Sequence, residues 1–465
     1  MKKRIYLSIA LVLALIMLIA ACAPDAPTGG GANGDGNVAD DNGSVTDDNG
    51  AATQPADGEI VFTLWNHRFE DFNVDFFTRV TEQYNALERG FYADITFVPG
   101  DVWDEQMTAA LATGTSPDLR TMAYNQILSA VRNGEIMALN DLLPQSAFDD
   151  IYDTVLEMIT VDGLVWAFPQ LIEPSAMLFY RTDLFEEAGI AGPPTTWDEM
   201  IEVGIILRDA FPDMFALEIG EMPAMGWRSW GEQYATNGHL AINDNWDTPL
   251  LGEGYAAMAE YYARMFEERI VPTQFLAYYP DIAPFGSGQV VMKLCGSWGI
   301  AGIVNDFPEV ADLFSVAPIP TRDGNQNVPT ATNGGWTYAI NSLSGNAEAA
   351  ADWISFVLAG DPSIPAEFFE MSAFSKASPR RSVDEWIAQN VEPEDFPWAE
   401  AVAHVASRAI PEPMYPWDIS AAVALMFEQV AIGGYSVDDA MAQAVATIEE
   451  VIRNQNLAGT NPRMP

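Results

Sequence analysis

The side chains best suited to chemistry in this chain are aromatic residues with short polar groups beside them. The sequence holds 13 Trp, 15 Tyr and 24 Phe. Examples occur in Gly-Trp-Arg-Ser-Trp (226–230), Gly-Ser-Trp (296–298) and Tyr-Asn-Gln (124–126). A flat ring packs against apolar C–H faces, while amides and hydroxyls exchange hydrogen bonds. Such residue types suit the wall of a small-molecule pocket, where rings stack on the ligand and polar groups exchange hydrogen bonds with it.

Catalytic motifs are harder to find. The chain has 66 Asp and Glu residues, so carboxylate pairs occur throughout it, and the separation that glycoside hydrolysis requires cannot be obtained from sequence. The serine-hydrolase motif Gly-x-Ser-x-Gly is absent, since Cys-Gly-Ser-Trp-Gly (295–299) only approaches it. The sequence has no P-loop or dinucleotide-binding motif. We therefore expect that the protein is not an enzyme, with a surface glycosidase as the enzymatic alternative.

Histidine and cysteine are rare in the sequence. Its three histidines are His67, His239 and His404, and its two cysteines are Cys22 and Cys295. They lack the spacing of zinc ligands. We expect no metal ion and no cofactor.

The N-terminal residues have the features of a secretory signal. Basic residues at positions 2–4 precede an apolar stretch, 5–21, that is slightly shorter than the ~20 residues of a membrane span. Small residues before Cys22 resemble the lipobox of bacterial lipoproteins, which implies a signal peptide at 1–21 and lipidation of Cys22. A plain transmembrane helix is the alternative. The segment 22–58 is rich in Gly, Asn and Asp, and is predicted to be a disordered tether.

The chain is strongly acidic, with a formal net charge of −45. Binding to nucleic acid is excluded because phosphate contacts require a basic surface. An acidic ligand is disfavoured, whereas a neutral or cationic ligand is compatible with this charge.

From residue 59 onward, strands and helices alternate in the predicted pattern. Alternating or apolar runs predict the strands, and helical spacing predicts the helices. The expected strands are 59–65, 93–98, 118–123, 178–180, 289–294 and 338–340. The expected helices are 72–87, 107–113, 127–133, 182–188, a longer helix from 196, 255–269, 347–358, 419–432 and 437–452. Thr196 and Glu199 form a predicted capping box. The alternation predicts parallel sheets with helices on both faces, and 314–320 is predicted to cross between two domains.

Several short motifs recur in a fixed order along the chain. They are Leu-Ala-Thr-Gly-Thr-Ser-Pro-Asp (111–118), Phe-Tyr-Arg-Thr-Asp-Leu-Phe (179–185), Pro-Pro-Thr-Thr-Trp-Asp-Glu (193–199), Gly-Ser-Trp (296–298), Ala-Pro-Ile-Pro (317–320), Asn-Gly-Gly-Trp (333–336) and Ser-Val-Asp-Asp-Ala (436–440). Their order and spacing resemble the extracellular solute-binding proteins of carbohydrate ABC importers, the family that includes maltose-binding protein. The likeness covers nearly all of 59–455.

This resemblance implies a two-lobed α/β fold of the periplasmic-binding-protein type II, with crossing strands as a hinge. The lobes are expected at 59–170 plus 314–362 and at 171–313 plus 363–465. The function implied is capture of a sugar or oligosaccharide between the lobes and delivery to ABC permease subunits. The protein is expected to be a monomer at the extracellular face of the cell membrane, to which its lipid anchors it.

The resemblance also assigns aromatic residues that would stack on the sugar. Trp298 and Trp227 match stacking residues of maltose-binding protein, and Trp230 matches a further cleft aromatic, with Arg228 between the last two. A buried role is the alternative for 226–230. Trp336 follows two glycines, which allow close approach of backbone to a ligand, although a core position is the alternative there.

Polar contacts are expected from loops at the carboxyl ends of strands, where open α/β sheets bind ligands. Asn66 and His67 follow the first predicted strand, and Tyr124, Asn125 and Gln126 follow another. Asn125 and Gln126 replace a charged pair of the relative, so the identity of its sugar does not transfer.

Two further residues complete the expected ligand-binding set. Glu173 matches an acidic contact at a crossing strand, with an exposed hinge charge as the alternative. Trp417 matches a C-terminal platform aromatic. The same fold binding another solute, such as a polyamine, is the alternative to a sugar-binding protein, but Trp, Asn and Gln in the expected cleft favour sugar.

Overall fold

The computed structural model describes residues 54–56, 58–391 and 396–463. The predicted signal peptide, Cys22 and nearly all of the predicted tether lie outside these residues. Within the described ranges, no helix combines the length and the apolar character that crossing a membrane requires.

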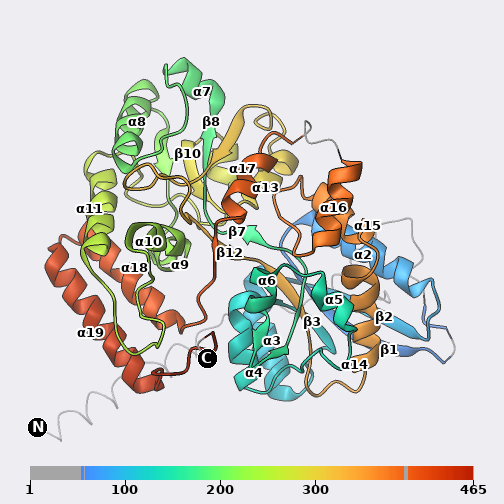
Figure 1. The fold of residues 1–465 in the computed structure, drawn as a ribbon. Coiled ribbons are helices and arrows are strands. Elements are labelled where there is room, and N and C mark those ends of the chain that lie inside the picture. The colour runs from blue at the N-terminus through green and yellow to red at the C-terminus, as the bar shows by residue number, and fades with distance from the viewer. Residues whose placement is uncertain (1–53, 57, 392–395, 464–465) are drawn as a thin grey trace, which may run out of the picture. The chain divides into compact units, whose positions relative to one another are not determined.

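The first of two large sheets has the strand order β2-β1-β3-β13-β6 (Figure 1). Its strands are β1 (Ile60–Arg68), β2 (Phe91–Pro99), β3 (Leu119–Ala123), β6 (Phe168–Pro169) and β13 (Trp336–Ile340). The predicted strands in these regions are confirmed. The prediction of a wholly parallel sheet is wrong, because β13 returns from the far half of the chain and runs antiparallel to β3 and β6.

Several helices belong to the same lobe as this sheet. They include α2 (Asp71–Asn85), α3 (Gly100–Thr113), α4 (Ile127–Arg132), α5 (Gln145–Asp149), α6 (Asp153–Met158) and α14 (Ala347–Ile354), which continues as a π-helical turn, Ser355–Ala359. In α2, the buried side chains include Phe72, Phe76, Val80 and Tyr84. Their spacing of four residues gives one apolar face, which explains why this helix was predictable from sequence.

The second large sheet has the strand order β11-β8-β10-β9. Its strands are β8 (Met177–Arg181), β9 (Phe215–Glu218), β10 (Val290–Cys295) and β11 (Phe314–Ala317). β11 pairs with β8 along its whole length, from Phe314 opposite Arg181 to Ala317 opposite Leu178. The prediction that 314–320 crosses between domains is therefore wrong for its first four residues, which are an edge strand of this sheet.

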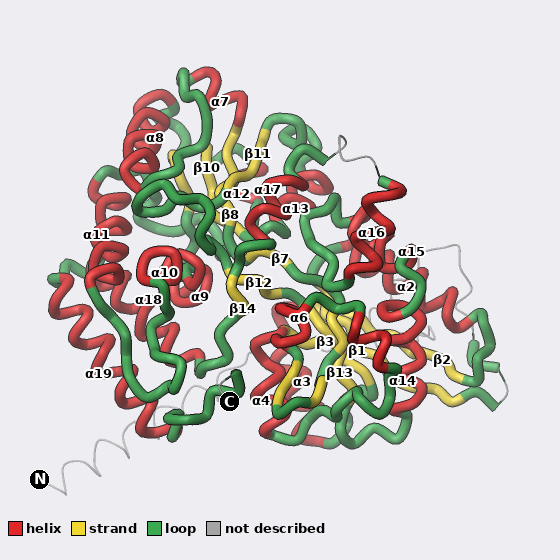
Figure 2. Tube along the Cα trace, in the orientation of Figure 1, coloured by secondary structure: helices red, strands yellow, loops and turns green. Residues whose placement is uncertain are grey.

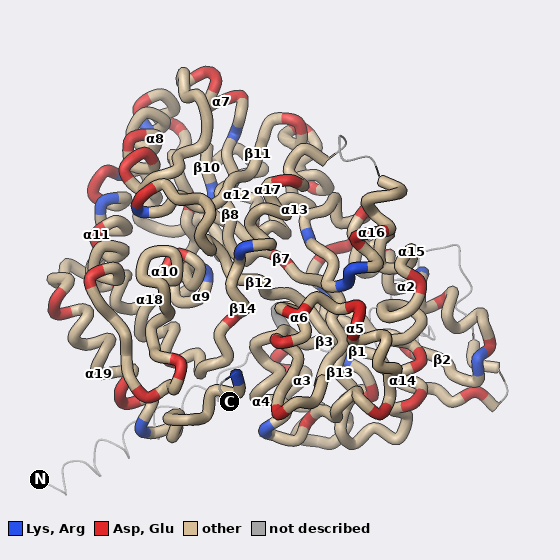
Figure 3. The backbone as a smooth tube through the Cα atoms, in the orientation of Figure 1, with Lys and Arg blue, Asp and Glu red and all other residues tan. Residues whose placement is uncertain are grey.

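Helices also surround the second sheet. They include α7 (Thr182–Glu187), α8 (Trp197–Ala210), α9 (Met225–Arg228), α10 (Trp230–Asn237), α11 (Glu253–Glu267), α12 (Ala283–Gly286), α13 (Gly299–Asp306), α17 (Ala399–Ala406), α18 (Trp417–Ala431) and α19 (Val437–Gln455). The predicted capping box at α8 is confirmed, because Glu199 N donates to Thr196 Oγ1 and Thr196 N donates to Glu199 Oε2. Acidic residues recur along the outer helices α8 and α11 (Figure 3).

A small sheet of order β14-β12-β7 joins the two halves. Its strands are β7 (Glu173–Pro174), β12 (Thr332–Gly334) and β14 (Ile410–Pro411). In the chain, β7 stands between β6 of the first sheet and β8 of the second, and β12 stands between β11 and β13. Figure 2 shows these short strands between the large sheets. The described chain thus forms two α/β lobes with crossing strands, as predicted.

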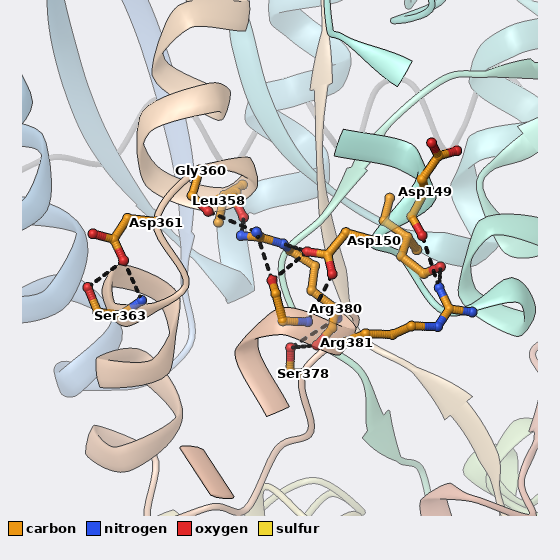
Figure 4. A network of polar contacts seen from close by, with 11 residues as sticks. Asp149, Asp150, Leu358, Gly360, Asp361, Ser363, Ser378, Arg380 and Arg381 are labelled. Carbon is orange, nitrogen blue, oxygen red and sulfur yellow. Dashed lines mark hydrogen bonds and ion pairs between the residues drawn. The ribbon is translucent and has the colours of Figure 1, made fainter. Parts of the chain in front are cut away.

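Residues just after α14 also pack on the first lobe. In α15 (Ser363–Met371), the Phe368 ring lies 5.4 Å from that of Phe72 in α2. Before α16 (Arg381–Asn390), Arg380 Nε lies 2.7 Å from Asp150 Oδ2, in a network that also includes the Gly360 carbonyl (Figure 4). This packing differs from the predicted border at 363, since an amphipathic pattern does not tell which sheet a helix will cover.

Candidate binding cleft between the lobes

A pocket of about 840 Å³ is lined by residues of both lobes. Trp103, Asn125 and Gln126 contribute from α3 and from the turn after β3 in the first lobe, and Trp230 and Trp417 contribute from the second lobe. Pockets of about 300–1,000 Å³ are typical of small-molecule sites. Four of the residues predicted from sequence therefore line one ligand-sized pocket. The side-chain amides of Asn125 and Gln126 are exposed in it.

The second-lobe wall of this pocket is aromatic. Trp230 Nε1 donates to Ser420 Oγ at 3.1 Å, which fixes the indole against α18. The Tyr415 ring stands edge-on to Trp230 at 6.4 Å and to Trp246 at 6.5 Å. Trp417, at the start of α18, is 52% exposed. A buried, held indole and an exposed one are thus presented to the same space.

The first lobe contributes a second aromatic group around His67. The His67 ring stacks on the Trp336 ring at 4.4 Å and meets the edge of the Trp103 ring at 5.2 Å. The Phe69 ring also stacks on Trp336, at 5.7 Å. Burial lowers the pKa of His67 to about 4, although Asp104 acts in the opposite direction. The imidazole is therefore neutral at ordinary pH and can serve as a flat, uncharged surface.

Trp227 and Trp298 lie together in the second lobe. Their rings are 6.5 Å apart at 26°, and Tyr279 stands edge-on to Trp227 at 5.2 Å. Trp298 Nε1 donates to the Pro280 carbonyl at 3.0 Å. Gly226 permits this placement, because a Cβ there would lie 2.4 Å from the Ser420 carbonyl oxygen of α18. Both indoles remain partly exposed.

Three residues predicted to contact the ligand are instead buried and bonded to other groups of the protein. Asn66 has no exposed surface, and its Nδ2 donates to Tyr338 Oη at 2.8 Å. Tyr124 Oη donates to the Leu171 carbonyl at 3.1 Å. Arg228 is fully buried, with Nη1 3.4 Å from Glu232 Oε1 and its guanidinium over the rings of two tyrosines. In this arrangement these three side chains hold neighbouring elements in place.

Glu173 lies in a buried charged cluster at the hinge. Lys376 Nζ is 2.9 Å from Glu70 and 3.5 Å from Glu173. Burial raises the pKa of Glu173, and Lys376 opposes that rise. Burial also raises the pKa of Glu412 to about 8, with Glu173 adding to the shift and Arg463 opposing it. Because Glu173 is only 9% exposed, the alternative of an exposed hinge charge is wrong.

Sequence reasoning missed several residues that line the pocket, including Trp103, Asp104, Trp246 and Tyr415. Trp103 and Asp104 follow β2, whose carboxyl end lies at the same sheet edge as those of β1 and β3. The rule that singled out the loops after β1 and β3 could have found them. No local signal marks Trp246. Among the described residues, no group of three or more His, Cys, Asp or Glu is arranged to hold a metal ion.

Two α/β lobes, crossing strands and an aromatic-walled pocket between the lobes define a solute-binding protein of the two-lobed type. The bacterial extracellular solute-binding protein family matches residues 73–359. This match covers more than half of the chain, and the chain belongs to that family. The family consists of binding proteins rather than enzymes.

Named relatives and solved structures agree with this assignment. The lactose-binding protein of Rhizobium radiobacter is 26% identical over 318 residues, which cover 65% of this chain and 71% of the relative. The mannitol-binding protein of Pseudomonas aeruginosa is 23% identical over 375 residues, which cover 74% and 82% of the two chains. A Thermotoga lettingae solute-binding protein with bound alpha-D-tagatose superimposes with a TM-score of 0.70 at 19% identity, over 84% of this chain and 99% of that one. The cyclic alpha-maltosyl-1,6-maltose binding protein of Arthrobacter globiformis gives 0.69 at 21%, over 85% and 100%.

Proposed function

We propose that this protein is the substrate-capturing component of an ABC importer for a sugar or a sugar alcohol. The observation that carries the proposal is a pocket between the lobes with indole rings and exposed amides in its walls, such as Trp230, Trp417 and Asn125. Relatives named for lactose and mannitol binding support the same class of ligand. An indole covers the C–H face of a sugar ring, and amides exchange hydrogen bonds with its hydroxyls.

Each lobe also has a stacking surface outside the lining of that pocket, and in this proposal lobe closure brings both surfaces onto the ligand. Trp336 and the neutral His67 form the surface of the first lobe, and Trp227 with Trp298 forms that of the second. Asn125 and Gln126 supply hydrogen bonds from the first lobe. The buried Asn66, Tyr124, Arg228 and Glu173 act as positioning residues, because each is engaged by a neighbouring protein group.

The binding test is a calorimetric titration of residues 59–465 with lactose, mannitol, tagatose and maltotriose, and with spermidine for comparison. We expect at least one sugar or sugar alcohol to bind, and we expect spermidine not to compete with it. Tight binding of spermidine alone would make the protein a polyamine-binding member of the family. The same preparation should leave oligosaccharides intact on long incubation, whereas turnover that survives repurification would contradict a purely binding role.

Delivery requires the loaded protein to stay close to its permease. We propose that the mature chain begins at Cys22, carries lipid on that residue, and works as a monomer at the outer face of the cell membrane. The small residues before Cys22 support this proposal. A fatty-acid label should be incorporated by the wild-type chain and lost in Cys22→Ser, and label that persists in this variant would overturn the lipid anchor.

A further inference from the structure

A second pocket, of about 450 Å³, opens in the second lobe. Its lining residues come from the end of β9 and the turn after it, from α11, from the segment 272–275 and from the end of α18 and the residue after it. It shares no lining residue with the pocket between the lobes. Its volume is within the range of small-molecule sites, so a ligand could be held here by one lobe alone.

A buried carboxylate lies in the wall of this second pocket. Glu218 is 1% exposed, and its Oε1 accepts the Leu276 N–H at 3.4 Å. Among the described residues its Oε2 has no hydrogen-bond partner. Lys293 lies opposite Glu218 in the β9–β10 register, but its ammonium likewise has no hydrogen-bond partner within the described chain. A buried carboxylate oxygen without a partner is costly, and a ligand that donates to it would remove that cost.

The other residues that line this second pocket indicate which kind of molecule it could hold. Phe266, Phe275 and Ile432 provide apolar surface, and the latter two are 53% and 50% exposed. A second carboxylate, Glu428, lies at the same pocket. Apolar walls with two acids select a molecule that has an apolar body and a positively charged hydrogen-bond donor.

We infer that this pocket binds an organic amine, with its ammonium group on Glu218 Oε2 and its apolar body against Phe266 and Phe275. This site is separate from the proposed sugar site, and sugar and amine should bind independently. Burial raises the pKa of Glu218 and the Glu221 carboxylate adds to the rise, while Lys293 and the backbone N–H groups of Leu276 and Gly220 lower it. Amine binding should therefore become tighter as the pH rises and the carboxylate ionises.

The test uses phenethylamine as the probe, with 2-phenylethanol and 3-phenylpropionate as neutral and anionic controls of similar size. Titration calorimetry should show binding of phenethylamine, weaker binding of the alcohol and none of the acid. Glu218→Gln keeps the shape of the side chain and should weaken phenethylamine binding roughly tenfold to a hundredfold, as expected for loss of a charge-assisted hydrogen bond. Phe275→Ala, at an exposed position, should weaken it without affecting the fold.

Glu260→Gln on the outer surface of α11 removes the same charge elsewhere and should leave phenethylamine binding unchanged. Equal binding by Glu218→Gln and the wild type would overturn the inference, as would competition between phenethylamine and a bound sugar. Absence of phenethylamine binding at millimolar concentration would also overturn it. If Glu218→Gln does not fold, Phe275→Ala decides, because unchanged binding by that variant would place the amine elsewhere.

Discussion

His67 and Trp336 stack with their ring centroids 4.4 Å apart and their planes at 27°. The two residues belong to β1 and β13, which are separated in the sheet by β3. Their contact joins the first strand of the lobe to the strand that returns from the other lobe. Because one of the rings is a histidine, its protonation state decides whether this surface is neutral or charged.

His67 should titrate far below an ordinary histidine. Burial lowers its pKa to about 4 from 6.5, because the charged imidazolium loses its hydration. We expect NMR of the His67 ring to show a titration midpoint near pH 4, compared with 6.5 for a histidine in a solvent-exposed peptide. Sugar affinity should then be independent of His67 charge between about pH 5.5 and 8. A midpoint near 6.5 would mean that the ring is solvated and not stacked.

Trp298→Ala should weaken sugar binding and leave the fold intact. The indole is partly exposed and shares its surface with Trp227, so truncation removes packing against the sugar's C–H face. The expected loss is roughly tenfold to a hundredfold in affinity, measured by calorimetry. Tyr278→Ala, at a residue that is 71% exposed, is the matched control and should bind normally. If Trp298→Ala binds sugar normally but melts at lower temperature, Trp298 is a core residue.

The neighbours Arg380 and Arg381 should differ sharply in their effect on stability. Arg380 is 5% exposed and pairs with Asp150 at 2.7 Å, whereas Arg381 is 39% exposed and pairs with a nearly fully exposed Asp153. Arg380→Ala leaves the partly buried Asp150 carboxylate without its cation and should lower the free energy of unfolding by about 3 kcal/mol. Arg381→Ala should cost less than about 1 kcal/mol. Urea denaturation measures both losses. Equal losses would contradict the burial of Arg380, whose contacts are drawn in Figure 4.

Glu412 should make the protein less stable as pH rises towards 8. Its pKa is raised by burial from 4.5 to about 8, so the unfolded chain loses this proton at lower pH than the folded chain. Its contribution to the free energy of unfolding is complete below about pH 4.5 and is lost as the pH rises through 8. Asp384, with a pKa raised by burial to about 6, acts in the same direction at lower pH.

The effect of Glu412 is measurable between pH 6 and 8. Glu412→Gln should raise the melting temperature at pH 8 and flatten its fall over this interval. Glu450→Gln, on the exposed face of α19, removes one charge and should leave the slope unchanged. Equal slopes in the wild type and Glu412→Gln would show that Glu412 is ionised in the folded protein at pH 6.

The sequence predicted individual helices and strands better than their partners. The apolar spacing in α2 is a local property, and so is the capping box of Thr196 and Glu199. Strand pairing is not a local property. β11 was predicted from its sequence to cross between domains, yet it hydrogen-bonds to β8. The same reason explains why the predicted lobe border at 363 differs from the packing of Phe368 and Arg380 on the first lobe, since an amphipathic face fits either sheet.

The candidate site was predicted in a similar, partial way. Aromatic residues and amides after strands indicated the correct region, and Asn125 and Trp417 lie in the pocket between the lobes. Sequence does not reveal which way a side chain points. Asn66 and His67 are adjacent, but the strand turns Asn66 inward to Tyr338 and His67 towards Trp336.

Sugar should close the two lobes, because its pocket takes walls from both. Asn125 in the first lobe and Trp417 in the second line one space of about 840 Å³, so a ligand that contacts both binds the closed state more tightly and shifts the population towards it. Small-angle scattering should show a smaller radius of gyration with sugar, together with a change in Trp fluorescence as Trp417, now 52% exposed, becomes covered. Phenethylamine, held by one lobe, should leave the radius unchanged. A sugar that binds without compaction would have to be held by one lobe, which contradicts the cleft as its site.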